Sequence, residues 1–238
     1  MKAAVLILAL AAATSAATIT STLYDTGVNG TGTPFTTLGA ADSHFTITAE
    51  PAGTGTPPFD AVTTYVGGYY ASGTSIGTTS ADWISTAYGP GSTLDTAVGL
   101  YNYEETVVTS GAGTFMFTGD WGTDNCGTIT VNGGSSPIAG TGTTIGGGAM
   151  AGCSTTNTSY FNTPTAFSFT VNLNSGTNSL DFNVWNSGGP TALFVDHLAT
   201  GAAASGTPEP SSTLYLLTGL SLLAGAMVRR RRACGGGA

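Results

Sequence analysis

The stretch FSFTVNL at residues 167–173 alternates large apolar and small polar side chains without interruption. A period of two is typical of a β-strand with one face against a core and the other towards solvent. A turn signal, NSGT at residues 174–177, leads to a second alternating stretch, SLDFNV at residues 179–184. The sequence therefore predicts two consecutive strands here and, with them, an all-β fold.

Shorter runs of the same kind occur along the rest of the chain. The residues with a strand pattern are 20–24, 44–48, 101–109, 114–121, 128–131 and 193–198. The pair Asn132-Gly133 is a typical β-turn dipeptide, and no long stretch has the period of an amphipathic helix. We therefore predict a β-sandwich or jelly roll over residues 18–199. An Ala/Gly/Ser linker is expected at residues 200–207.

The basic residues lie only at the two ends of the chain, as Lys2 and as four arginines near the C-terminus. Lys2 precedes an apolar run at residues 3–13, and small residues follow at 15–17. This is the pattern of a secretory signal peptide. We expect residues 1–17 to be this signal, with signal peptidase cleaving after Ala16 or Ala17.

A second apolar run, residues 213–228, is followed directly by Arg229, Arg230, Arg231 and Arg232. As a helix this run is about 24 Å long, against a hydrocarbon core of about 30 Å. Flanking arginines extend towards the interface and make a short span tolerable. Basic residues on one side predict that side to be cytoplasmic. The sequence therefore predicts a transmembrane helix with the body of the chain outside.

The order of parts at residues 208–232 resembles the PEP-CTERM sorting signal of bacterial proteins. Pro208, Glu209 and Pro210 form the tripeptide, and a polar step, the apolar span and the arginines follow. The resemblance implies that an exosortase recognises the tripeptide and cleaves near it, and that the product is exported with an extracellular polysaccharide matrix. Residues 233–238, with Cys234, form a tail where the family usually stops.

Residues 101–198 also resemble the galactose-binding-like jelly roll, which serves as a sugar-binding or accessory domain. The matching stretches are GDW at 119–121, DN at 124–125, ITVNG at 129–133, FSFTV at 167–171 and GTNSLDFNV at 176–184. The resemblance implies a structural calcium ion, for which Asp120, Asp124 and Asn125 offer oxygen ligands. Their spacing matches no dedicated calcium loop. The alternative is a turn in which these side chains bind their own backbone.

The body, which is the part of the chain expected to be exported, contains no Lys or Arg. It is acidic, because twelve of the thirteen Asp and Glu residues lie in it and only Glu209 lies in the sorting tail. Such a body cannot neutralise phosphates, so nucleic acid and anionic membranes are excluded as partners. Cys126 and Cys153 are the cysteines of this part. An isolated pair in an oxidising compartment predicts a disulfide, which would stabilise the fold by about 3–4 kcal/mol.

Catalytic patterns are weak. GTSIG at residues 73–77 matches the G-x-S-x-G nucleophile elbow, but that elbow requires a strand-to-helix turn. Asp196 and His197 are neighbours in a predicted strand, so their side chains point to opposite faces unless the strand bulges. Glu104 and Glu105 diverge for the same reason, whereas a glycosidase needs two carboxyl groups facing one sugar. We therefore expect no enzymatic activity, and a secreted hydrolase is the least favoured alternative.

The tryptophans indicate a candidate carbohydrate-binding site better than the catalytic patterns indicate an active site. Trp185 is in phase with Asp181 and Asn183 and out of phase with the apolar residues around it, which predicts an outward position. An outward indole can stack on a sugar ring. Trp83 is a second candidate, and burial under other parts of the chain is the alternative for both.

Together these patterns predict an exported, non-catalytic protein. It is first anchored in the inner membrane and then belongs to the cell envelope or the extracellular matrix. Its expected role is structural or associated with extracellular polysaccharide. A carbohydrate-binding module that uses Trp185 is the alternative.

Overall fold

The computed structural model describes residues 16–51, 56–64, 80–87, 97–134 and 164–202. Four regions lie outside these residues, namely most of the predicted signal peptide, the predicted sorting signal at 208–232, the GTSIG stretch at 73–77 and Cys153. What the sequence predicts for them stays a prediction.

Within the described residues the chain forms strands and no helix. The strands are β1 (Ala41–Ala49), β2 (Phe59–Thr63), β3 (Ile84–Ser85), β4 (Gly99–Thr109), β5 (Gly113–Asp124), β6 (Cys126–Val131), β7 (Thr165–Leu173), β8 (Gly176–Asn186) and β9 (Ala192–Ala202). All neighbouring strands pair antiparallel. The prediction of an all-β fold is confirmed.

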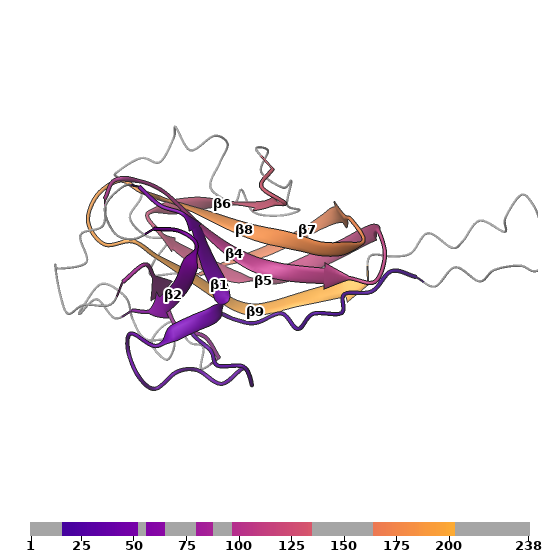
Figure 1. The fold of residues 1–238 in the computed structure, drawn as a ribbon, viewed down its shortest axis with the longest axis horizontal. Helices are drawn as coiled ribbons and strands as arrows, with labels where there is room; N and C mark the ends of the chain where they lie inside the picture. The colour runs from indigo at the N-terminus through magenta and orange to yellow at the C-terminus, as the bar shows by residue number, and fades with distance from the viewer. Residues whose placement is uncertain (1–15, 52–55, 65–79, 88–96, 135–163, 203–238) are drawn as a thin grey trace, which may run out of the picture. The chain divides into compact units, whose positions relative to one another are not determined.

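The described strands form one curled sheet with the order β6-β8-β4-β1-β2-β3-β9-β5-β7. The curl brings β6 and β8 against β5, so the sheet encloses a core as a sandwich does. The long strands β4, β5, β8 and β9 run along its length (Figure 1). From β4 to β9, consecutive strands alternate between the two halves of the sheet, and none of them pairs with the next. The finer assignment to a jelly roll stays a prediction.

The core is formed by the inward residues of strands from both halves. Its large members are Phe45, Ile47, Tyr101, Tyr103, Phe117, Phe169, Phe182 and Ile129, each at most 1% exposed. The Phe182 ring lies 6.0 Å from the Phe45 ring and 6.2 Å from the Trp121 ring, measured between centroids. Because Phe45 and Trp121 belong to β1 and β5, Phe182 joins the two halves of the sheet. The apolar residues of the alternating stretches in β7 and β8 are the ones that pack in this core, which explains why they alternate with polar residues.

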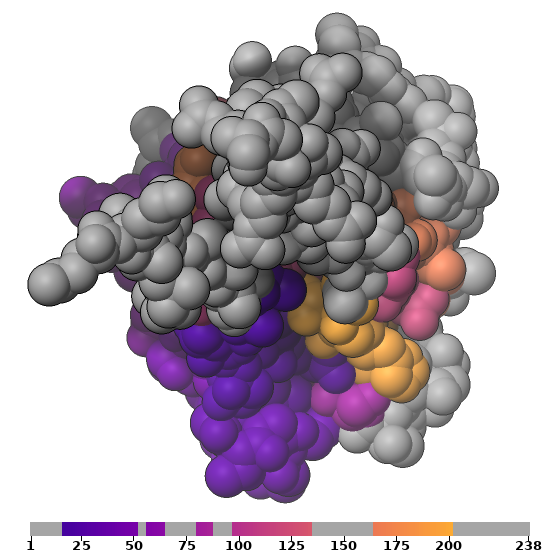
Figure 2. All heavy atoms as spheres, turned by 90° about the vertical axis from the view of Figure 1, so that its right-hand side faces the viewer, coloured from indigo at the N-terminus to yellow at the C-terminus, as the bar shows by residue number. Residues whose placement is uncertain are grey.

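The prediction of a strand at residues 20–24 is wrong. Only Ile19 makes an isolated β-bridge there, to Thr109. The chain from residue 16 to 28, here called the N-terminal segment, instead connects β4 to β9. The amide of Thr20 donates to the Val108 carbonyl at 2.8 Å, and the amide of Thr26 donates to the Val195 carbonyl at 2.9 Å. Figure 2 shows this indigo segment next to the yellow β9.

The two ends of the described body emerge at the same end of the sheet. The amide of Ser110, in the turn after β4, donates to the Thr18 carbonyl at 2.9 Å. At the other terminus Ala202 pairs with Phe115 near the start of β5. β9 therefore continues through residues 200–202, which we expected to belong to the linker. The opposite end of the sheet carries the start of β4 and the end of β8.

Replacing Phe182 with alanine is expected to lower the free energy of unfolding by about 3–5 kcal/mol, because a buried ring is removed from between the two halves. Urea unfolding followed by tryptophan fluorescence measures this change. Thr177→Ala, at an exposed position of the same strand, is the control and should alter stability by about 0.5 kcal/mol or less. A loss below about 1 kcal/mol in Phe182→Ala would contradict this packing.

Candidate functional site

The outward side of β8 carries the predicted ligand-binding residues Asp181, Asn183 and Trp185. They alternate with Leu180, Phe182 and Val184, which are buried in the core. The prediction that these three residues share one face is therefore confirmed. The structure brings them together.

Strand register extends this face across β4 and β6. Three rows of paired residues lie side by side, namely Leu100–Trp185–Cys126, Asn102–Asn183–Thr128 and Glu104–Asp181–Thr130. Paired residues on adjacent antiparallel strands point to the same side of a sheet. We call these nine residues the outer face. It is apolar at one end, amide-rich in the middle and acidic at the other end.

Hydrogen bonds fix the two amides in the middle row. Asn102 Nδ2 donates to Asn183 Oδ1 at 2.9 Å, and Asn183 Nδ2 donates to Thr130 Oγ1 at 2.9 Å. The Thr48 hydroxyl of β1 donates to Asn102 Oδ1. Each amide oxygen accepts one of these bonds and keeps a second lone pair. The row is thus a preorganised set of acceptors for hydroxyl groups.

The apolar end of the outer face is partly open to solvent. Trp185 is partly buried beside its cross-strand partner Leu100, which is 36% exposed. Val98, just before β4, is 60% exposed. We call Val98, Leu100 and Trp185 the apolar patch. An indole with aliphatic neighbours and adjoining amides is an arrangement suited to a polyhydroxylated ring.

Two carboxyl groups form the acidic end. Glu104 and Asp181 are direct cross-strand partners. Burial raises the pKa of Glu104, and the neighbouring Asp181 carboxylate raises it further. Asp181 is 2% exposed, and its Oδ2 accepts a hydrogen bond from the Gly133 amide at 2.8 Å. Glu104 is the more accessible member of this pair.

Trp83 does not belong to this face, and the prediction that it offers a ligand platform is wrong. Its side chain is 1% exposed and packs 5.4 Å from the Phe194 ring, measured between centroids. Ala81 and Ala192 complete this small cluster. An indole enclosed in this way has no free face for a sugar.

The structure does not bring the three predicted calcium ligands together. Asp120 precedes Asp124 by four residues on β5, which separates them by about 13 Å. Asn125 Nδ2 donates to Asp124 Oδ1 at 2.7 Å, and Asn125 Oδ1 accepts from Ser187. Asn125 is therefore bound to the Asp124 side chain and to Ser187 after β8, and not to its own backbone as in the alternative. Within the described ranges, no group of three His, Cys, Asp or Glu side chains is placed to hold a metal ion.

The side chains of Asp196 and His197 are in contact, because β9 bulges at this point. From the sequence we expected them to point to opposite faces unless the strand bulged. The pairing of β5 with β9 shifts between Thr118 and Asp120, and His197 has a φ of 54°. His197 Nδ1 lies 3.3 Å from Asp196 Oδ2. However, the Ser80 hydroxyl donates to Asp196 Oδ1 at 2.6 Å, so the serine binds the carboxylate rather than the imidazole. This is not the order of a Ser-His-Asp triad.

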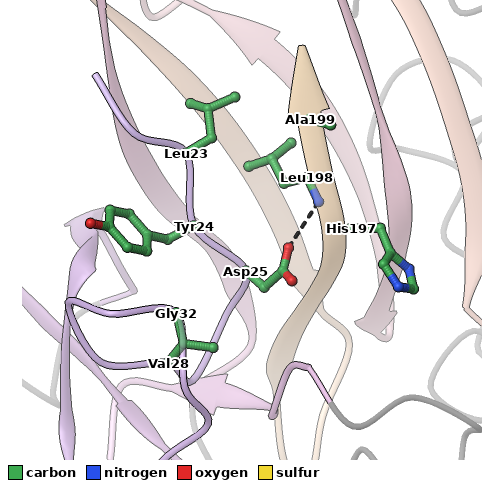
Figure 3. A pocket seen from close by; sticks show the side chains of 8 residues that line it. All are labelled: Leu23, Tyr24, Asp25, Val28, Gly32, His197, Leu198 and Ala199. Atoms are coloured by element: carbon green, nitrogen blue, oxygen red, sulfur yellow. Dashed lines mark hydrogen bonds between the residues drawn. The ribbon is translucent and has the colours of Figure 1, made fainter. Parts of the chain in front are cut away.

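A pocket of about 320 Å³ lies between the N-terminal segment and β9 (Figure 3). Its lining is formed by Leu23, Tyr24, Asp25, Val28, Gly32, His197, Leu198 and Ala199. Asp25 points towards β9, where its Oδ1 accepts a hydrogen bond from the Leu198 amide at 2.8 Å. Burial raises the pKa of Asp25, and Asp196 adds to the rise. The carboxyl group of Asp25 therefore holds the segment against the sheet.

Two further acids hold the same segment from the β1–β4 side. Glu105 Oε1 accepts from the Tyr24 amide at 2.8 Å, and Asp42 Oδ2 accepts from the Gly27 amide at 2.7 Å. Burial raises the pKa of Asp42 and raises that of Glu105 well above its usual range. Glu105 points inward and Glu104 outward, so the prediction that these neighbours diverge is confirmed.

Cys126, at the start of β6, is not a free thiol. Cys153 lies outside the described residues, so the pairing of these two cysteines stays a prediction.

Sequence reasoning missed several members of the outer face. Leu100 and Asn102 become neighbours of Trp185 and Asn183 only through the pairing of β4 with β8. The signal in the sequence was the alternation LYNYE at residues 100–104, in which Leu100, Asn102 and Glu104 share one phase.

Comparison with known proteins finds no matching family model, no matching curated protein and no matching solved structure. The resemblances to PEP-CTERM proteins and to the galactose-binding-like jelly roll therefore rest on the motifs that carry them. No helix among the described residues is long and apolar enough to cross a membrane, and the predicted span at 213–228 is not among them.

The free energy of unfolding is expected to fall as pH rises from about 4 towards 8. Asp25, Asp42 and Glu105 have raised pKa values when folded, so the folded state binds more protons than the unfolded state above their ordinary pKa values of about 4. The stabilisation is complete below that pH and is lost through the folded-state pKa values. Thermal unfolding between pH 4 and pH 8 measures it.

Glu105→Gln should flatten this pH dependence, because an amide keeps the acceptor for Tyr24 and cannot ionise. Thr177→Ala, which removes no ionisable group from an exposed position of β8, is the control and should leave the slope unchanged. A slope that is the same in Glu105→Gln and in the unmodified protein would show that Glu105 is not the group that titrates.

A disulfide between Cys126 and Cys153 should appear in non-reducing peptide mapping. Cys153→Ser should then lower the free energy of unfolding by about 3–4 kcal/mol, the chain-entropy value for a loop of this size. Cys234→Ser is the control and should have no effect. A peptide that links Cys126 to Cys234 instead would refute the pairing.

Proposed function

We propose that this protein is an exported, non-catalytic component of the bacterial envelope or extracellular matrix that associates with polysaccharide. The observation that carries the proposal is the outer face, where fixed amides adjoin a partly exposed indole. Signal peptidase and an exosortase are its partners during export. The extracellular polysaccharide is its partner afterwards.

The export part of the proposal is supported by the two ends of the sequence. A cleavable signal, the tripeptide at residues 208–210, an apolar span and four arginines follow the order of an exosortase substrate. The body also suits a tethered precursor, because Thr18 and Ala202 lie at the same end of the sheet. From Leu100 to Thr109, β4 extends about 30 Å away from that end. The apolar patch therefore lies far from both attachment points.

The polysaccharide part is supported by the chemistry of the outer face. A sugar ring presents C–H groups on its faces and hydroxyl groups on its edge. The Trp185 indole offers a surface for the first, and the oxygens of Asn102 and Asn183 accept bonds from the second. The galactose-binding-like jelly roll is the fold that we propose for this arrangement. The alternation of β4–β9 between the two halves of the sheet supports that choice.

A hydrolase is the least favoured alternative. Glu104 and Glu105 face opposite sides of β4, and Ser80 is bonded to Asp196 instead of to His197. A purely structural role without a ligand is the main competitor. The outer face distinguishes the two, because a spacer needs no fixed acceptors beside an indole.

Trp185→Ala is expected to abolish retention of the protein on polysaccharide in affinity electrophoresis and to remove its signals on a glycan array. The stacking surface is lost, whereas the core residues on the opposite side of β8 stay in place. Trp83→Phe is the matched control, since that side chain is buried elsewhere. If neither the unmodified protein nor the control binds any glycan, the structural role replaces the binding role.

Mass spectrometry of the exported product should find an N-terminus at Ala17 or Thr18 and a C-terminus near Pro208–Pro210. Both follow from processing by signal peptidase and exosortase. Replacing the tripeptide with Ala-Ala-Ala should leave the apolar span attached and keep the protein in the membrane fraction. Recovery of the intact arginine tail in the unmodified exported product would remove the sorting proposal.

A further inference from the structure

We propose that the outer face selects a polysaccharide with free amino groups, an amine-bearing hexosamine polymer, over neutral and uronic-acid polymers. This inference rests on the proposed polysaccharide binding and names the class of ligand. It follows from the charges beside the amide row.

The acidic end of the outer face continues onto the neighbouring strands. Glu104 pairs with Asp181 on one side and with Thr46 of β1 on the other. Thr46 in turn pairs with Asp60 of β2, an exposed residue. Carboxyl groups of three strands therefore lie in one row that crosses the sheet next to the amide row.

No Lys or Arg of the body can neutralise this row, since Lys2 and the four arginines belong to the predicted signal and the predicted sorting tail. His44 of β1 is bound to Asp42 instead. Glu104 and Asp181 are cross-strand partners and repel each other when both are ionised. Burial raises the pKa of Glu104, and the Asp181 carboxylate adds to the rise. A ligand ammonium group beside Glu104 relieves the repulsion and gains a charge-assisted hydrogen bond. A ligand carboxylate adds to the repulsion, and a neutral ligand leaves it unchanged.

The spacing on the face requires a polymer. Trp185 and Asp181 are four residues apart on β8, which places the apolar and acidic ends about 13 Å from each other. A single sugar ring does not span this distance. A chain with one ring on the indole reaches the amide row with the next ring and Glu104 with a later one.

The test measures binding of three hexasaccharides of equal length to the purified exported protein by isothermal titration calorimetry. The hexamers are of glucosamine, N-acetylglucosamine and galacturonic acid, which differ in charge. We expect the glucosamine hexamer to bind at least about tenfold more tightly than the acetylated one. A hydrogen bond between a ligand ammonium group and the Glu104 carboxylate is strong enough to give this difference in affinity. The galacturonic acid hexamer should not bind, and added salt should weaken binding of the glucosamine hexamer.

Glu104→Gln should lower the affinity for the glucosamine hexamer to about that for the acetylated one, so that the preference is lost. Asp120→Asn removes the same charge from β5, in the other half of the sheet, and should leave the preference intact. Equal affinity of the unmodified protein for the two hexosamine hexamers overturns this inference but leaves polysaccharide binding standing. An equal loss in both variants also overturns it, because general charge attraction would then explain the preference. Absence of binding to any of these hexamers or to the glycan array removes both proposals.

Discussion

The body of this chain has no lysine or arginine, so its buried carboxyl groups are stabilised by backbone amides, hydroxyl groups, the His44 imidazole or their own proton. The N-terminal segment meets this requirement. Its amides at Tyr24 and Gly27 bind Glu105 and Asp42, and its own Asp25 binds the Leu198 amide. These three bonds connect β1, β4 and β9, which belong to different parts of the curled sheet. Closure of the sheet around its core therefore depends on satisfying these buried acids without lysine or arginine.

The same lack of cations explains the character of the outer face. Inside the fold, backbone amides bind the carboxyl groups of Asp25, Asp42 and Glu105, whereas Glu104 faces outward. Its charge is left to solvent or to a ligand. The neighbouring amides are already fixed by Thr48 and Thr130, so binding costs little ordering of side chains. The absence of lysine and arginine from the body thus affects both the buried carboxyl groups and the surface that we propose to bind polysaccharide.

The period of two in the sequence defines the faces of strands but not their neighbours. It predicts β7 and β8 and places Trp185 outward, yet β8 pairs with β4 and β6, because the short turn after β7 passes to the other half of the sheet. Trp83 stands in a loop-like stretch and is buried by Phe194, far along the chain, which no local pattern reveals. The bulge at His197 depends on the register between β5 and β9. A local stretch of sequence thus shows which side chains share one face of a strand. It does not show which strands pair, in which register they pair, or which side chains other parts of the chain cover.

The place of the apolar patch on β4 and β8 links the two parts of the proposed function, polysaccharide binding and export. Both strands run from the end where Thr18 and Ala202 emerge to the end where Leu100 and Trp185 meet, and core residues hold them along this length. A precursor attached through its C-terminal span would therefore present the patch away from its point of attachment. Binding of a polymer there needs no prior removal of the tail, since no residue of the outer face belongs to it. The proposed binding surface and the proposed sorting signal therefore consist of different residues, and each can be altered without changing the other.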